Sequence, residues 1–185
     1  MKTLAKTFTA LSVFLLMACG GPSLEKYYVE NQEKDNFVVV NVPSDVLIGD
    51  ASKLSKEEKA TLEKIEKANV LAFPLNEQNK TMFKKEKAEL EKILKDEEYK
   101  LLMKFGSPEK EFKLMYTGDP EAIDEIIVYG SSEEAGFGVA RILGNDMDLG
   151  AMMKLVKSLK EKDVELNIEG IEGLQTMFEK EEDSL

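Results

Sequence analysis

Apolar and polar residues alternate with a period of two along much of the second half of the chain. Four segments show this alternation: residues 99–105, 112–116, 126–129 and 137–143. It is typical of half-buried strands, and the short turns that join these segments favour an antiparallel meander. Two earlier strands are also predicted, a β-branched one at 37–42 that ends before Pro43 and a short buried one at 70–73.

Three other stretches have apolar residues at the spacing of an α-helix. The first, 55–67, opens with Ser55 and Glu58, which fit a capping box at a helix start. The second, 79–97, is dense in lysine and glutamate, as expected of a solvated face. The third, 149–159, has an apolar stripe made of Leu149, Met152, Met153, Val156 and Leu159. We therefore expect three amphipathic helices beside the strands.

One face of the strand at 137–143 carries almost no side chain. Gly136, Gly138 and Ala140 fall on that face, and large residues occupy the other. Such a face indicates close approach by another element, so we expect the helix at 149–159 to cross tightly over it. Grouped strands followed by a helix predict an α+β fold, an antiparallel β-meander sheet with helices packed mainly on one face.

The first 18 residues have the zones of a secretory signal peptide. Lys2 and Lys6 make its start positive, and residues 8–17 form an apolar stretch too short to cross a bilayer permanently. An ordinary secretory signal would end in a cleavage site without further chemistry. Here a cysteine follows directly.

The residues Leu16, Met17, Ala18 and Cys19 resemble the lipobox of bacterial lipoproteins. The resemblance implies that the Cys19 thiol receives diacylglycerol, that cleavage occurs on its amino side, and that the new amine is acylated. Several acyl chains together hold a protein stably on a bilayer. Gly20 is not aspartate, which by a retention rule of the enterobacterial type favours the periplasmic face of the outer membrane, with surface exposure left open.

Charge and composition exclude several classes of protein. Without residues 1–18 the chain holds 23 basic and 36 acidic side chains, a net charge of −13, which repels nucleic acid and anionic lipid. With one cysteine and no histidine, the chain lacks an internal disulfide, histidine-dependent catalytic relays and ordinary zinc sites. We therefore expect no catalytic residues, no cofactor and no metal.

The order of these segments predicts the domain organisation. Residues 1–18 are the signal peptide, and 19–35 are expected to form the lipidated cysteine and a flexible tether. Residues 36–163 form the α+β domain. Residues 164–185 are an acidic extension, with a short amphipathic helix predicted around Ile168, Ile171, Leu174 and Phe178.

Several segments together resemble a family of small Bacteroidota lipoproteins described as domain of unknown function 4252. The matching stretches are the lipobox, the helix before 99–103, and residues 125–129, 139–143 and 144–149 with the helix that follows. The resemblance covers about residues 65–160 and the signal. It implies a location and a fold, and it assigns no catalytic residue.

Two short motifs suggest ligand sites. Residues 145–150 invite a calcium interpretation, but the twelfth position of such a loop would be Lys157 instead of a glutamate. We expect Asp148 to cap the following helix instead. Residues 136–141 half-match a dinucleotide-binding glycine motif, yet they lie inside a predicted strand and lack the third glycine.

Three further features have an ordinary structural explanation. Arg141, the only arginine, is expected to form a salt bridge at a sheet edge. Glu133 and Glu134 could serve hydrolysis, but they lie in a predicted solvent turn. The adjacent Met152 and Met153 are expected to pack in the core.

These observations predict a lipid-anchored, non-catalytic domain of the cell envelope. It would act as an adaptor or sensor accessory through contacts with another envelope protein, whose identity the sequence does not give. Two alternatives stay open. One is a small-ligand-binding or hydrolytic lipoprotein that uses carboxylates and Arg141, and the other is a structural protein that assembles with itself.

Overall fold

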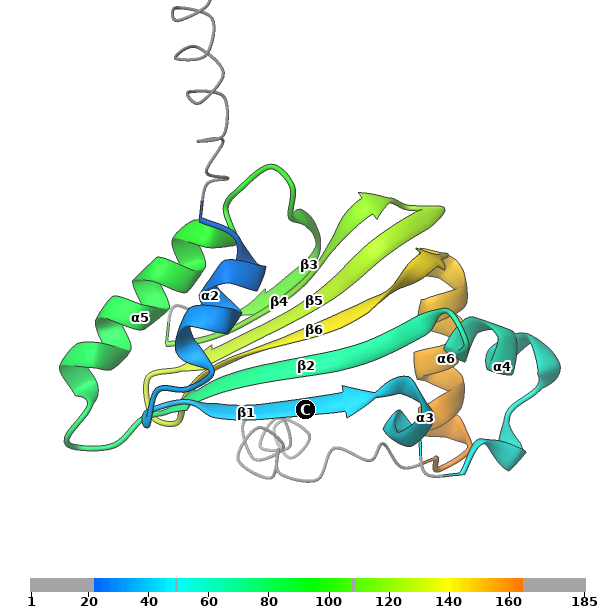
Figure 1. The fold of residues 1–185 in the computed structure, drawn as a ribbon, viewed down its shortest axis with the longest axis horizontal. Helices are drawn as coiled ribbons and strands as arrows, with labels where there is room; N and C mark the ends of the chain where they lie inside the picture. The colour runs from blue at the N-terminus through cyan, green and yellow to red at the C-terminus, as the bar shows by residue number, and fades with distance from the viewer. Residues whose placement is uncertain (1–21, 49, 108, 165–185) are drawn as a thin grey trace, which may run out of the picture.

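The computed structural model describes residues 22–48, 50–107 and 109–164, and the structural statements below concern these residues. Figure 1 shows their arrangement. In chain order the elements are α2 (Leu24–Asn31), β1 (Val38–Pro43), α3 (Ser44–Leu47), a 3-10 helix (Ala51–Lys53), α4 (Lys56–Leu62), β2 (Ile65–Pro74), α5 (Lys80–Ile93), β3 (Lys100–Gly106), β4 (Lys110–Asp119), β5 (Ala122–Ser132), β6 (Gly136–Met147) and α6 (Leu149–Glu161).

The strands form one six-stranded antiparallel sheet in the order β1-β2-β6-β5-β4-β3. Strands β3 to β6 follow one another as the predicted meander, and β2 pairs with β6 to bring β1 to the far edge (Figure 1). Gly118 and Gly136 adopt φ angles of 85° and 117°, which L side chains rarely tolerate, at strand ends where the chain turns. The predicted α+β fold on an antiparallel meander is confirmed.

Helices α2 and α5 cover one face of the sheet, here called the aromatic face. Its largest core cluster holds Phe37, Phe73, Phe83 and Phe137, and the Phe73 and Phe137 rings stack with centroids 5.4 Å apart. Helix α5 is amphipathic as predicted, with Phe83, Leu90 and Ile93 turned inward. Glu86 is also buried and accepts a hydrogen bond from the Tyr27 hydroxyl of α2.

Helix α6 lies against the opposite face, at one end of the sheet (Figure 1). The prediction that it crosses Gly136, Gly138 and Ala140 is wrong. A single residue, Asp148, separates β6 from α6. The helix therefore begins directly at the end of the strand and packs against residues nearer to that end, including Ile142.

The apolar stripe of α6 also differs from the prediction. Met152, Leu155 and Leu159 are buried, whereas Met153 and Val156 are 42% and 59% exposed. The predicted stripe and the buried residues both fit the period of a helix. The direction in which α6 leaves β6 determines which of the two faces the sheet. Core packing is therefore confirmed for Met152 and wrong for Met153.

The folded body starts earlier than predicted. Residues 24–31, expected to belong to a flexible tether, form α2, with Leu24, Tyr27 and Tyr28 at most 4% exposed. The Ser23 hydroxyl caps this helix by accepting from the Lys26 amide at 3.2 Å. Burial of two tyrosine rings outweighs the polar residues between them.

Helix α4 begins with the predicted capping box but ends sooner than predicted. The Ser55 amide donates to the Glu58 carboxylate at 2.6 Å, and the Glu58 amide donates to the Ser55 hydroxyl at 3.2 Å. The helix stops at Leu62 rather than Lys67, because Ile65 already belongs to the long strand β2.

Glu58 also joins α4 to the end of α6 and gives the fold a pH dependence. Lys162 donates to its carboxylate at 2.7 Å, and this bond, with that of the Ser55 amide, lowers the pKa of Glu58 to about 2. Because the pKa in the folded protein lies below its ordinary value, the stabilisation is present above that value and is lost as pH falls toward 2.

We therefore expect Glu58→Gln to lower the melting temperature at neutral pH, and the difference from wild type to shrink as pH falls from 5 toward 2. Thermal unfolding followed by circular dichroism measures both. Glu57→Gln, at the neighbouring exposed position, is the matched control. An equal effect of the two substitutions at all pH values would contradict the role of Glu58.

Candidate functional site

The lipobox residues Leu16, Met17, Ala18 and Cys19 lie outside the described residues, so their lipidation stays a prediction. Within the part of the chain that the structure describes, no helix is long and apolar enough to cross a membrane. Helix α2 begins at Leu24, which leaves four residues between Cys19 and the folded body. Four extended residues span about 14 Å.

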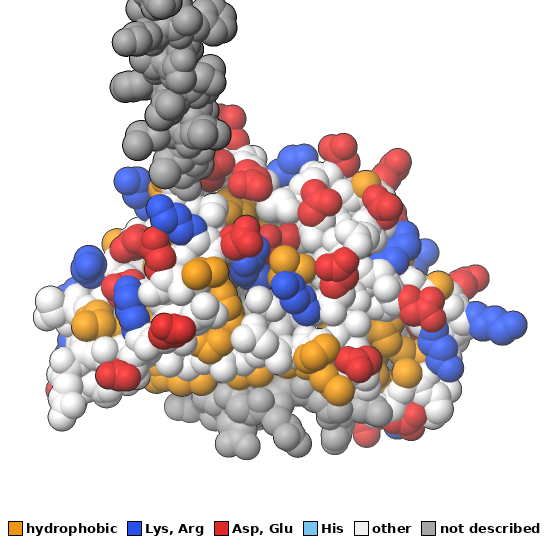
Figure 2. Space-filling view, viewed as in Figure 1, with side chains coloured by type: hydrophobic (Ala, Val, Ile, Leu, Met, Phe, Trp, Pro, Cys, Tyr) orange, Lys and Arg blue, Asp and Glu red, His pale blue; other side chains and the backbone are white. Residues whose placement is uncertain are grey.

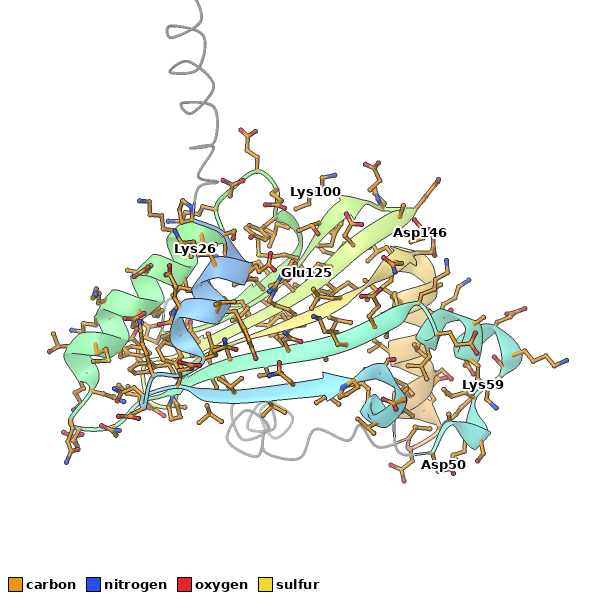
Figure 3. The ribbon with its side chains drawn as sticks, in the orientation of Figure 1. Lys26, Asp50, Lys59, Lys100, Glu125 and Asp146 are labelled. Atoms are coloured by element: carbon orange, nitrogen blue, oxygen red, sulfur yellow. The ribbon has the colours of Figure 1, made fainter. Side chains whose placement is uncertain are left out.

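Arg141 forms a buried bidentate ion pair with Glu125 on the aromatic face. Its Nε donates to one carboxylate oxygen at 2.5 Å and its Nη2 to the other at 3.1 Å. The two residues are 6% and 8% exposed, and Figure 3 shows Glu125 on the face that also carries α2. The predicted salt bridge is confirmed, but its predicted edge position is wrong because β5 and β6 lie inside the sheet.

Two tyrosines lie near this ion pair, Tyr28 on α2 and Tyr99 just before β3. The Tyr28 hydroxyl donates to the Asn41 side chain at 2.8 Å, and the Leu24 amide donates to the Tyr99 hydroxyl at 2.9 Å. Burial raises the pKa of both tyrosines. Burial lowers the pKa of Arg141, but the hydrogen bonds and charge of Glu125 outweigh it and leave that pKa raised. The guanidinium atoms that face Glu125 are therefore committed to a structural contact.

A shallow hollow of about 370 Å³ lies beside this pair. It is lined by Asn41, Val42, Pro43, Glu66, Lys67 and Asn69. Asn69 pairs with Arg141 across the strands, and its buried Oδ1 accepts no hydrogen bond from the described residues. The lining holds one carboxylate, so it does not provide the pair that glycoside hydrolysis requires.

A second hollow, of about 420 Å³, lies between α5 and the β3–β4 hairpin. Three of its lysines form ion pairs: Lys104 and Lys113 contact Glu111 at 2.7 and 2.6 Å, and Lys87 contacts Glu133 at 2.8 Å. The hydrogen bond from Lys104 to Glu111 raises the pKa of this lysine. Glu133, half of the carboxylate pair considered above, is thus held by Lys87.

Asp148 caps α6, as predicted. The Ala151 amide donates to Asp148 Oδ1 at 2.7 Å, and the Asn145 side chain donates to Glu66 at 2.6 Å. The glycine motif that starts at Gly136 lies in β6, inside the sheet. Among the described residues, no three acidic, cysteine or histidine side chains form a metal-binding group.

The candidate site that best suits an interaction is the outer edge of β3. This strand ends the sheet, and all seven of its residues are exposed. Leu101, Leu102, Met103 and Phe105 are 55%, 37%, 43% and 43% exposed, although large apolar side chains are usually buried. The Phe105 ring stacks on Phe112 with centroids 4.4 Å apart, which fixes its position at this edge.

A β-bulge shapes this edge. The register shifts between Leu101 and Met103, so Leu102 is an extra residue in the pairing with β4. Bulges on edge strands hinder indiscriminate pairing between sheets and turn side chains toward new directions. The bulge therefore presents a short apolar segment without leaving a long flat edge. Sequence alternation predicted this strand, but gave no sign that it would be an exposed edge.

Comparison with known proteins identifies the family. A family model described as a domain of unknown function matches residues 27–155, from α2 into α6. Neither the curated proteins nor the solved structures contain a match. The match covers most of the chain, and the chain belongs to this family, the domain of unknown function DUF4252.

Proposed function

We propose that this protein is a lipid-anchored lipoprotein of the cell envelope whose domain binds a protein partner through the β3 edge. In this proposal Cys19 carries diacylglycerol and acyl chains, and the domain acts without catalysis at the periplasmic face of the outer membrane. The observation that carries the proposal is the group of four exposed apolar side chains on β3. Phenylalanine and methionine are enriched at protein interfaces relative to the rest of the surface.

The position of this edge relative to the anchor favours a partner close to the bilayer. The Leu24 amide, at the start of α2, contacts the Tyr99 hydroxyl, and Lys100 begins β3. Only four residues separate Leu24 from Cys19. An acylated Cys19 would therefore hold the start of β3 near the membrane surface, within reach of another membrane-attached protein.

The remaining surface gives less support to other ligands. Figure 2 shows basic and acidic side chains interspersed over the face that carries α2 and α5. Such a surface lacks the continuous basic patch that nucleic acid or anionic lipid requires. The Arg141 and Glu133 groups considered for ligand binding are both engaged in ion pairs. Contact with a protein is therefore the function that these residues support best.

Photo-cross-linking in intact cells tests the proposal. A photoreactive residue at Phe105 should give a discrete protein adduct, and one at Val46, which is 47% exposed on α3, should not. Leu102→Glu should reduce the Phe105 adduct at least about tenfold, since a charge in an apolar contact removes more than 1.4 kcal/mol of binding free energy.

Leu102→Gln serves as the matched control, because it removes the apolar side chain without adding charge and should have a smaller effect. Adducts of equal yield at Phe105 and Val46 would overturn the proposal. Adducts with lipid alone would show that the β3 edge inserts into the bilayer and would overturn it as well.

A further inference from the structure

The sheet face opposite α2 and α5 is apolar from one edge to the other. Strand pairing aligns two rows across all six strands on this face, here called the smooth face. They are Val38, Ala72, Gly138, Gly130, Phe112 and Phe105, and Val40, Val70, Ala140, Val128, Leu114 and Met103. The middle of both rows holds glycine, alanine and valine, and larger side chains stand only on β4 and β3.

The described helices leave this part of the sheet uncovered. Helix α6 packs against the neighbouring row, with Ala68, Ile126 and Ile142, at one end of the face. In Figure 1 it lies behind that end of the sheet. An apolar surface of this extent is exceptional on a soluble domain unless something binds to it.

Two residues of this face are almost inaccessible to water. Val70 and Ala72 are only 4% and 7% exposed. The described apolar residues packed with them, Val40 and Ala140, are their neighbours in the same face. Lateral neighbours alone leave the outward side of a sheet residue open to water, so we infer that a further segment binds over these two residues.

The path of the chain after α6 leads toward this face. Asp163 has a φ angle of 50°, and the Val164 amide donates to the Leu159 carbonyl at 3.0 Å, which together form a Schellman motif that ends the helix. Val164 is buried beside Ile48, just after β1 and α3, and Lys53 donates to the Asp163 carbonyl at 3.1 Å. The chain is therefore fixed at the β1 side of the sheet when it leaves the described body.

The sequence that follows has the length and pattern that the smooth face requires. Ile168, Ile171, Leu174 and Phe178 recur at helical spacing, separated by glutamates and small residues. A helix over residues 166–178 is about 20 Å long, and six strands span about 24 Å. Gly170 and Gly173 each weaken an isolated helix by about 1 kcal/mol, so this segment needs a surface on which to fold.

We propose that residues 166–178 bind across the smooth face, with Ile171 and Leu174 over the small residues of β2 and β6, Val70 and Ala140. The acidic side chains of the segment then point to solvent. This intramolecular cover converts an apolar sheet face into a charged surface and keeps two copies of the domain from associating through it. The two rows end on β3 at Met103 and Phe105, which stay 43% exposed, so the segment lies over the strands farther from that edge and leaves the proposed partner site open.

A thiol at Val70 reports directly on this cover. Residues 19–185 with Cys19→Ser and Val70→Cys contain a single cysteine, whose alkylation rate by N-ethylmaleimide is compared with that of Val29→Cys, an exposed position on α2. We expect the Val70 thiol to react at least about tenfold more slowly. Ile171→Glu with Leu174→Glu should raise its rate at least about fivefold and leave the Val29 rate unchanged.

Two further variants make the outcome decisive. Glu169→Gln with Glu172→Gln should leave the Val70 rate unchanged, and a thiol at Val139, 1% exposed on the aromatic face, should stay unreactive throughout if the fold is intact. An unchanged Val70 rate in the Ile171→Glu, Leu174→Glu protein would overturn the proposal. Protection that falls on dilution would assign the smooth face to a second copy and would equally overturn it.

Discussion

Replacing Arg141 with methionine should lower the free energy of unfolding by about 3–5 kcal/mol, because Glu125 would stay in the sheet without its partner. Both charges lie on interior strands, and their side chains are 8% and 11% exposed. Water therefore reaches the carboxylate poorly, and no other basic side chain among the described residues forms an ion pair with it. Urea denaturation of wild type and variant measures the loss.

A double variant distinguishes the cost of an unpaired charge from the cost of the changed side-chain volume. In the double variant Arg141→Met, Glu125→Met, the uncompensated charge is gone, and much of the stability should return. Arg141→Lys keeps the charge but loses the bidentate geometry, so it should be less damaging than methionine. A loss below about 1 kcal/mol in Arg141→Met would show that Glu125 gains access to water.

Local sequence patterns predicted the elements of this fold well. Alternation from Tyr99 onward gave the four strands of the meander, and the Ser55 and Asp148 caps form the hydrogen bonds expected of them. Strand alternation and helix caps depend on residues a few positions apart, so the local sequence is enough to predict them. Helix α2 was missed although Leu24, Tyr27 and Tyr28 are spaced on one helical face, because charged residues between them suggested a tether.

Features that depend on strand order could not be predicted in this way. The pairing of β2 with β6 joins residues far apart in the chain, and it decides that Arg141 is interior and that β3 is an edge. The candidate interface at β3 follows from that order, since the same alternating sequence inside the sheet would be core. The direction of α6 is similarly set by where β6 ends, which left the smooth face free for another segment.

The earlier start of the folded body changes what the proposed lipid anchor could do. With the tether expected over residues 19–35, the domain could have moved freely far from the bilayer. With α2 beginning at Leu24, only four residues, at most about 14 Å of chain, separate the folded body from Cys19. A net charge of −13 after residue 18 opposes adsorption to anionic lipid, so the proposed attachment would depend on acyl chains on Cys19.

Changing Cys19 to serine should therefore move the protein from the membrane fraction to the soluble fraction. The ratio of membrane-bound to soluble protein should fall at least about tenfold, because each buried methylene of an acyl chain contributes about 0.8 kcal/mol. The variant should carry an ordinary secretory signal in place of residues 1–18, so that an uncleaved signal peptide does not hold it at the membrane. Intact mass of the wild-type protein should show the diacylglycerol and acyl groups on Cys19. A high-salt wash screens charge contacts with the membrane but leaves apolar anchoring in place. A serine variant that stays with membranes after this wash would show that another part of the chain provides the attachment.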